Sequence, residues 1–262
     1  MEFNVMLQQL GVHDGLLNAE EKSSLDHDGF VILRDVFTRE QIAALQSFID
    51  GYIAAHKPTR DEPGCDRLYH LIDKSPLIDN VWTNPRLLAA AQHILKAEFR
   101  PMSVNYRTAL PGHGHQELHS DRTWTAAGQH SYGQAIIAMV DFSPVNGSTR
   151  AVPGTHRHHK VPADEMTDVR ARHPRQMELT ITAGSVFFFN GCLWHSGTQN
   201  NSSQPRPALH CGYSLRHSDN ASLEMQRGTI TKEMYDRLSP VRRNFLDLKV
   251  APTLAPTDAH MF

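Results

Sequence analysis

Two histidines and a carboxylate give this sequence its clearest potential for chemistry. His119 and Asp121 occupy alternate positions of the run His119-Ser120-Asp121, and His195 follows much later in the chain. Residues at alternate positions of an extended segment point to the same side, and a histidine from a distant strand can complete one face of a metal ion. Two imidazoles and one carboxylate hold Fe(II) and leave coordination positions open for O₂ and a co-substrate. The spacing therefore predicts a non-haem Fe(II) site.

Histidine is abundant here, so the triplet needs support from its context. The chain has 17 histidines and a second triplet of the same form, His217-Ser218-Asp219. The first triplet is followed by further strands, by His195 and by Arg206. The second triplet is followed by a single histidine, His260, in a loose tail. We therefore interpret the second triplet as a solvated loop. The same interpretation applies to the histidines after the turn at Pro153-Gly154, namely His156, His158 and His159.

The elements that must position these residues begin with a helical first third. Thr38 and Gln41 form a capping box, and the apolar spacing after them predicts a helix to about His56. A second helix is predicted from Asn84, an N-cap followed by Pro85, to about Lys96. A short buried strand is predicted at 30–33, and the polar segment 57–66 is predicted to be a loop.

Short apolar segments separated by Gly- and Pro-marked turns replace this pattern from Phe99 onward. The predicted strands are Met102–Thr108, Gln134–Phe142, Met177–Thr182, Val186–Phe189 and Ala208–Leu215. Phe187, Phe188 and Phe189 are predicted to be core, and Cys192 and Cys211 are predicted to be small buried residues. Such a series favours a sandwich or barrel over a parallel sheet. We expect a mostly β protein with flanking helices around a double-stranded β-helix, the cupin-like jelly roll.

Composition excludes several other classes of protein. Lys and Arg number 26 against 28 Asp and Glu, and the formal charge of −2 argues against a general hold on nucleic acid. No apolar run of about 18 residues is present to span a membrane, and the start lacks the pattern of a signal peptide. Three cysteines without C-x-x-C spacing indicate neither a disulfide framework nor a thiolate zinc site. We expect one cytoplasmic domain over 1–262, with a helical part at about 1–98, a jelly-roll core at about 99–216, and a C-terminal helix, starting near Ser239, and tail within 217–262.

Several motifs, taken in order, resemble the phytanoyl-CoA dioxygenase family of Fe(II)- and 2-oxoglutarate-dependent oxygenases. The segment Leu25–Ile32 and the helix after it look like the family's opening. The resemblance spans about 25–215, and the combined order of the motifs is specific to the family although each motif alone is a weak signal. The matching runs are Gln116-Glu117-Leu118-His119-Ser120-Asp121, Asn146-Gly147-Ser148-Thr149-Arg150-Ala151-Val152-Pro153-Gly154-Thr155-His156, Trp194-His195-Ser196-Gly197 and Arg206-Pro207.

The resemblance implies a role for each matching residue. His119, Asp121 and His195 become the Fe(II) ligands. Arg206, eleven residues after His195, becomes the arginine that grips the distal carboxylate of 2-oxoglutarate, because a guanidinium can donate two parallel hydrogen bonds to it. Gln116 resembles the glutamine at the metal-side end of the co-substrate, and Thr149 a hydroxyl that helps to hold its distal carboxylate.

The expected reaction uses O₂ and 2-oxoglutarate to hydroxylate or otherwise oxidise a small organic substrate, with release of succinate and CO₂. Because Asp121 keeps a carboxylate where related halogenases have a small residue, oxygenation or desaturation is predicted rather than chlorination. The substrate is not named by any motif, and both a monomer and a homodimer stay open. The residues predicted to line the substrate pocket are Tyr69, Arg107, Trp124 and Arg216.

Two alternatives come from other classes. A cupin-like zinc or manganese enzyme would use the same three ligands without 2-oxoglutarate, and Arg206 would then have no role. A non-catalytic jelly roll with a decayed metal site is disfavoured, because all three ligands and the arginine are present together.

Overall fold

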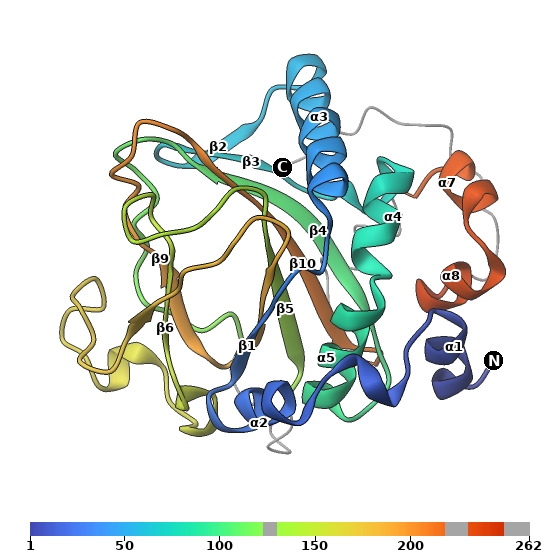
Figure 1. Cartoon of the computed structure of the whole chain (residues 1–262), viewed down its shortest axis with the longest axis horizontal. Helices are drawn as coiled ribbons and strands as arrows, with labels where there is room; N and C mark the ends of the chain where they lie inside the picture. The colour runs from blue at the N-terminus through green and yellow to red at the C-terminus, as the bar shows by residue number, and fades with distance from the viewer. Residues whose placement is uncertain (123–129, 218–229, 249–262) are drawn as a thin grey trace.

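A computed structural model of the chain describes residues 1–122, 130–217 and 230–248. Figure 1 shows strands gathered on one side and helices on the other. The helices are α1 (Phe3–Gln9), α2 (Ala19–His27), α3 (Arg39–Ala55), α4 (Pro76–Trp82), α5 (Pro85–Leu95), α7 (Lys232–Arg237) and α8 (Pro240–Phe245). The strands are β1 (Phe30–Leu33), β2 (Thr59–Glu62), β3 (Cys65–Leu68), β4 (Phe99–Ala109), β5 (Tyr132–Ala138), β6 (Thr149–Val152), β7 (Met177–Glu178), β8 (Val186–Asn190), β9 (Trp194–Gly197) and β10 (Arg206–Leu215).

Two antiparallel sheets form the β-rich part of the described chain. The larger has the order β1-β8-β5-β10-β4-β3-β2, and the smaller has the order β7-β6-β9. A buried apolar cluster includes Ile136, Phe187 and Ala208 from the larger sheet and Ala151 from the smaller one. The two sheets therefore pack face to face, which confirms the predicted jelly roll with flanking helices.

Strand β10 separates the two cores, because its side chains alternate between the faces of the sheet. Leu209, Cys211 and Tyr213 pack with the helices. Arg206 and His210 face the cavity between the sheets. The strand thus supplies an apolar outer face for the helical layer and a polar inner face for a site.

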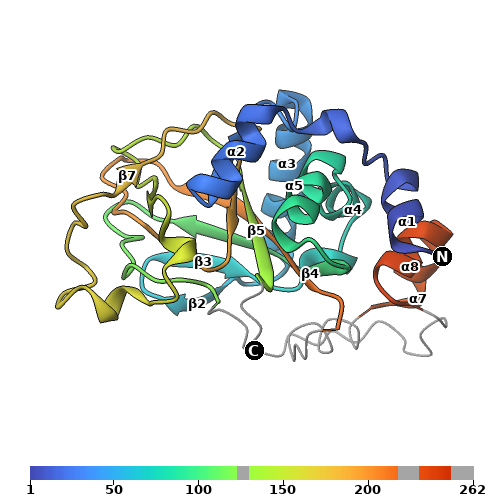
Figure 2. The same cartoon turned by 90° about the horizontal axis from the view of Figure 1, so that it is seen from below.

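The helices cover the outer face of the larger sheet, as Figure 2 shows for α3, α4 and α5. Both predicted helix starts are confirmed. Thr38 and Gln41 make a reciprocal capping box at the start of α3, and the Asn84 side chain accepts from the backbone N–H of Arg86 at the start of α5. The C-terminal helix predicted after Ser239 is also confirmed, with Ser239 as the N-cap of α8.

The segment 57–66 is not the loop that its polarity predicted. It forms most of a hairpin, β2–β3, at the edge of the larger sheet. An edge strand with solvent on its outer side needs no apolar alternation. Ion pairs between Arg60 and Asp66 and between Arg67 and Glu62 join the two strands instead. As a result the part of the chain at 1–98 contributes three strands, β1 to β3, and is not purely helical.

The remaining differences concern the bounds of strands, elements without an individual prediction and one histidine. Strands β4, β8 and β10 are longer than predicted and β5 and β7 are shorter, while β6, β9 and the helices α1, α2, α4 and α7 were not individually predicted. His156 is 3% exposed, so its interpretation as solvated was wrong, whereas His159 is exposed. The predicted burial of Phe187, Phe188, Phe189, Cys192 and Cys211 is confirmed. The division into one domain stays a prediction. Among the described residues, none of the helices combines the length and the apolar character that a bilayer crossing requires.

Candidate active site

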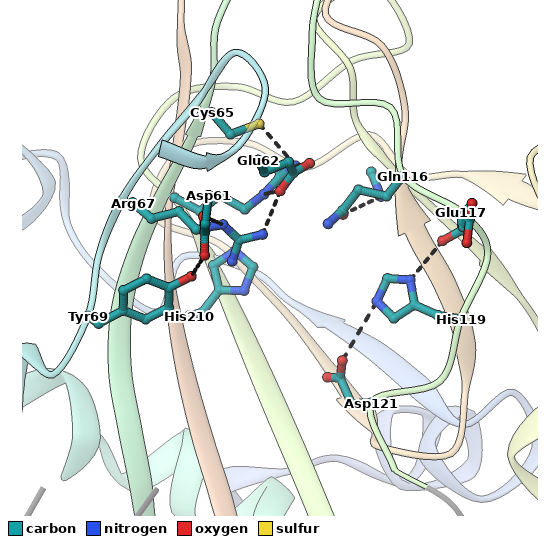
Figure 3. A network of polar contacts seen from close by, with 12 residues as sticks. Asp61, Glu62, Cys65, Arg67, Tyr69, Gln116, Glu117, His119, Asp121 and His210 are labelled. Carbon is teal, nitrogen blue, oxygen red and sulfur yellow. Dashed lines mark hydrogen bonds and ion pairs between the residues drawn. The ribbon is translucent and has the colours of Figure 1, made fainter. Parts of the chain in front are cut away.

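A two-way backbone pair brings the metal-binding motifs together. The N–H of His119 donates to the carbonyl of His195 at 3.0 Å, and the N–H of His195 donates back at 2.9 Å. This antiparallel bridge places both side chains on one side. Asp121, two residues after His119, points the same way, as Figure 3 shows. Its Oδ1 lies 3.8 Å from the Nε2 of each imidazole.

Local hydrogen bonds set the tautomer of both histidines. The Nδ1–H of His119 donates to the carbonyl of Glu117 at 2.8 Å, and that of His195 donates to the carbonyl of Leu193 at 3.0 Å. A neutral imidazole with its proton on Nδ1 keeps a lone pair on Nε2, which is the atom that faces Asp121. Both rings are therefore oriented as metal ligands are in proteins.

The electrostatics of the three side chains also fit a cation. Their ligand atoms all lie within 4.8 Å of one another. The Oδ2 of Asp121 is buried and accepts no hydrogen bond within the described chain. Burial lowers the pKa of His195 to about 4, so this ring stays neutral and able to ligate. A divalent ion between the two Nε2 atoms and the Asp121 carboxylate would give this otherwise unpaired carboxylate a partner, and we conclude that the residues fit an iron ion.

The cavity beside this group is about 220 Å³ and contains the other predicted site residues. Gln116, Thr149 and Arg206 line it together with the two histidines and Asp121. The Oε1 of Gln116 accepts from the N–H of Gly197 at 3.2 Å, which leaves its amide N–H groups for a ligand. The structure thus brings together all six residues that the family resemblance assigns.

Arg206 is a buried cation without a carboxylate partner in the described residues. It is 3% exposed, its guanidinium lies 4.8 Å from the ring centre of Phe142, and its Nε has no hydrogen-bond partner. Burial and the nearby charge of Arg107 lower its pKa to about 10. Burying an unpaired charge is costly, so such a residue indicates a site for an anion.

Comparison with known proteins decides the family. The family model for phytanoyl-CoA dioxygenase (PhyH) matches residues 25–208. The chain belongs to the phytanoyl-CoA dioxygenase family. The chain is accordingly a non-haem Fe(II)- and 2-oxoglutarate-dependent dioxygenase, an oxidoreductase, as its relatives also indicate.

Individual relatives agree with this assignment. An ectoine dioxygenase of Bordetella parapertussis is 27% identical over 234 residues, covering 75% of each chain. The dioxygenase trt7 of Aspergillus terreus is 24% identical over 221 residues, covering 76% of this chain and 73% of its own. Among solved structures, iron-bound EctD from S. alaskensis has a TM-score of 0.65 at 19% identity and covers 78% of this chain and 79% of its own.

The substrate-pocket residues predicted for this phytanoyl-CoA dioxygenase family member are dispersed. Arg107 lines the cavity. Tyr69 does not line it, and its hydroxyl donates to Asp61 at 2.5 Å on the hairpin. Arg216 lies beyond the cavity at the far end of β10, where it pairs with Asp247. Trp124 lies outside the described residues, as do Ser218 and Asp219 of the second triplet.

Several cavity residues were missed, although the family motifs lie close to them. The missed residues on β4 and β10 lie at alternate positions, because every second side chain of a strand faces the cavity. Counting back from Arg107 and forward from Arg206 in steps of two would have found some of them once the strands were placed. The missed cavity residues include Arg67, Ser103, Asn105, Tyr132, Gln134 and His210.

Glu62 on the hairpin neutralises two of the cavity arginines. It accepts from Arg107 and Arg67, each at 2.6 Å at the closest. Burial would raise the pKa of this carboxyl, but the hydrogen bonds and charges of Arg107 and Arg67 outweigh it and lower the pKa to about 2. Arg206 is consequently the cavity arginine that lacks an acidic partner in the described part of the chain.

We expect Glu62→Gln to lower the free energy of unfolding by roughly 2 kcal/mol at neutral pH. A carboxyl whose pKa is lowered by folding stabilises the protein above its unfolded pKa, and this stability is lost as the pH falls from about 4.5 towards 2. Urea unfolding of both proteins across this range measures the difference, which should shrink with acidity. Glu117→Gln, at a carboxylate 58% exposed, is the control. A difference that did not change with pH would contradict the role of the charge.

Arg150 on β6 ties the segments of the site together. Its buried guanidinium donates to the Ser196 hydroxyl beside His195 at 2.6 Å and to the carbonyl of Gln116 at 3.3 Å. Its other acceptors are Ala171 O, Gln176 Oε1 and Val169 O. The cation is thus satisfied without any carboxylate at hydrogen-bond distance in the described residues, and its role is to hold loops in place.

Arg150→Lys is expected to destabilise the protein by about 2–4 kcal/mol, because an ammonium cannot reach acceptors on several sides and leaves buried carbonyls unpaired. Chemical unfolding measures the loss. Arg172→Lys, at a guanidinium 70% exposed, provides the matched control and should change stability by less than about 0.5 kcal/mol. Equal effects of the two substitutions would show that the buried network adds nothing.

Proposed function

We propose that His119, Asp121 and His195 bind the Fe(II) of this dioxygenase and that Arg206 binds the distal carboxylate of 2-oxoglutarate. The single observation that carries the proposal is the pairing, in one cavity, of an orphaned carboxylate oxygen with an orphaned guanidinium. A divalent cation supplies the first with a partner, and a dicarboxylate that reaches from the metal to Arg206 supplies the second. A metal enzyme without 2-oxoglutarate would leave Arg206 unpaired.

The protein's own residues orient and enclose the reactants. Fe(II) and 2-oxoglutarate, when bound, would supply the activation of O₂, with the 2-oxo acid converted to succinate and CO₂ as the substrate is oxidised. The Nε2 atoms of His119 and His195 and the Asp121 carboxylate fix the position of the ion. Arg206 and Thr149 hold the far end of the co-substrate, and a Gln116 amide N–H contacts its metal-side end.

The cavity favours a small hydrophilic substrate. Its volume of about 220 Å³ must accommodate 2-oxoglutarate as well, and polar side chains predominate on its wall. The polar residues that the co-substrate assignment leaves for the substrate include Arg67, Asn105, Arg107, Gln134 and His210. Ectoine, the compound in the names of several relatives, is therefore the first substrate to test.

Release of succinate from 2-oxoglutarate tests this function directly. The purified protein should produce succinate only with added Fe(II), and a true substrate should accelerate the release. Anaerobic titration with 2-oxoglutarate should show saturable binding. A protein that binds iron but neither binds nor consumes 2-oxoglutarate would refute the assignment of Arg206.

The carboxylate of Asp121 also predicts the type of product. Because this side chain occupies the position that halogenases leave open to chloride, we expect oxygenated or desaturated products in excess chloride. Mass spectrometry distinguishes these from chlorinated ones. Asp121→Gly is the matched comparison, and a chlorinated product from the unaltered protein would contradict the ligand role of Asp121.

A further inference from the structure

One cavity histidine has no role in the iron and co-substrate assignment. His210 lies on β10, paired in register with Asn105 of β4 and Ile136 of β5. It lines the same cavity as His195, and Figure 3 shows it beside Arg67 of the hairpin. It does not belong to the group of potential metal ligands found in the described chain.

A short relay of hydrogen bonds sets the tautomer of His210. The Tyr132 hydroxyl donates to Gln134 Oε1, so the amide nitrogen of Gln134 is the atom that faces His210 Nδ1, at 3.5 Å. An amide nitrogen carries only donors, and the imidazole Nδ1 must therefore accept. A neutral imidazole has one N–H, which is then on Nε2.

The backbone of β10 makes room for this relay. A Cβ at Gly212 would lie 2.3 Å from the Tyr132 hydroxyl oxygen. Gly212 is opposite Gln134 in the register, two residues after His210. A glycine at this position is thus what allows Tyr132 to reach Gln134.

The Nε2 of His210 is left free to serve a ligand. No hydrogen bond is made to it within the described residues, and it is not among the buried nitrogens cut off from solvent. Burial lowers the pKa of His210 well below its usual value, as do the charges of Arg107, Arg67 and Arg206. The ring is consequently a neutral donor that opens into the cavity.

We propose that His210 is a specificity-determining residue whose Nε2–H donates a hydrogen bond to an acceptor oxygen of the molecule bound beside the metal. Such a donor takes a carboxylate, carbonyl or hydroxyl oxygen and rejects an ammonium group, which has no lone pair. The oxygen belongs either to the metal-side end of 2-oxoglutarate or to the organic substrate. This inference rests on the proposed function of the same cavity.

The first experiment determines the tautomer without any organic ligand. Protein labelled with ¹⁵N-histidine and loaded with Zn(II) is studied by NMR, and His210→Gln assigns the ring. We expect Nε2 to carry the proton, and Tyr132→Phe to produce a mixture of tautomers because the amide of Gln134 is then free to turn. A proton on Nδ1 in the unaltered protein would mean that the relay runs in the opposite direction and would overturn the proposal.

The second experiment identifies the source of the oxygen. The Fe(II) protein and its His210→Phe and His210→Gln variants are titrated anaerobically with 2-oxoglutarate. If the co-substrate supplies the oxygen, His210→Phe binds it about tenfold or more weakly, and His210→Gln recovers part of the loss through its amide N–H. If the organic substrate supplies the oxygen, the wild type and the two variants bind 2-oxoglutarate equally tightly. Acetate, a carboxylate probe added to the Zn(II)–2-oxoglutarate protein, then shifts the Nε2–H signal of His210. The proposal would be overturned if the His210 variants bound 2-oxoglutarate as tightly as the wild type and the Nε2–H signal shifted with neither 2-oxoglutarate nor acetate.

Two controls distinguish a failure of the His210 proposal from a failure of the proposed function. His217→Gln alters an exposed histidine outside the cavity and should change neither measurement. Arg206→Met in the same titration tests the co-substrate assignment. If Arg206→Met kept full affinity for 2-oxoglutarate while His210 showed the expected tautomer, the proposed function would fail and the donor role of His210 would stand.

Discussion

Replacing His195 with alanine is expected to lower iron affinity by at least about 100-fold and to abolish succinate release. Mutation of a residue that hydrogen-bonds to a metal ligand typically lowers the metal affinity by roughly 10–100-fold, and removal of a ligand itself lowers it further. His195 is buried, and the Leu193 carbonyl holds its ring in a single tautomer, so alanine removes a ligand atom that the fold has already oriented. His119→Ala should behave similarly, with a smaller effect on stability because its side chain is 39% exposed.

Bound iron, measured by metal analysis after gel filtration, and succinate release decide this prediction. His217→Ala is the matched control, because it removes the histidine of the other triplet from an exposed position. It should retain iron and activity near the wild-type level. Loss of iron in the His217 variant alone would overturn the assignment of the metal site.

Arg206→Ala should weaken binding of 2-oxoglutarate by about 100-fold or more. Hydrogen bonds to charged groups are worth roughly 1.5–3 kcal/mol each. Two such bonds, allowing for non-additivity and a bridging water, give a net loss of about 3–4 kcal/mol. Arg206→Lys should recover only part of this, because an ammonium supplies charge without the two-pronged geometry. Iron binding should change little.

An anaerobic titration of 2-oxoglutarate against the Fe(II) charge-transfer band measures these affinities. Arg172→Ala, at an exposed guanidinium that pairs with Glu178, is the control. Wild-type affinity in the Arg206→Ala protein would show that the cavity holds its co-substrate in another way, or holds none.

Replacement of Arg206 is also expected to change the thermal stability of the protein. Because Arg206 is buried beside Arg107 without an acidic partner in the described chain, its charge destabilises the ligand-free protein. Arg206→Met keeps much of the volume and removes the charge. The ligand-free variant should therefore unfold at a temperature equal to or above that of the wild type, and 2-oxoglutarate should no longer stabilise it.

Local sequence was sufficient for features that depend on neighbours in the chain. The helix starts at Thr38 and Asn84 follow from side chains that bond to backbone N–H groups two or three residues away. The spacing of His119 and Asp121 fixes a common side for the two, since alternate residues of an extended segment point together. These predictions need no knowledge of the rest of the fold.

The hairpin β2–β3 shows what local sequence could not provide. Its strands carry charged residues because their outer side faces solvent, and composition alone resembles a loop. Only its position at the edge of the larger sheet brings Glu62 to Arg107, and that pairing decides that Arg107 is neutralised while Arg206 is not. Burial of His156 against Gly29 was equally hidden, because it depends on contact between distant segments.

The sequence by itself indicated the proposed ligand set and its spacing, the jelly-roll class and the family, since these depend on residue types, periodicity and the order of motifs. Only the tertiary structure decided which polar residues share the cavity. Register between β4, β5 and β10 aligns Asn105 with His210 and Gln134 with Gly212, and a shift by one residue would turn each of these side chains to the other face. Register is set by packing of the whole sheet, so the donor on His210 and the unpaired charge on Arg206 exist only in the folded protein.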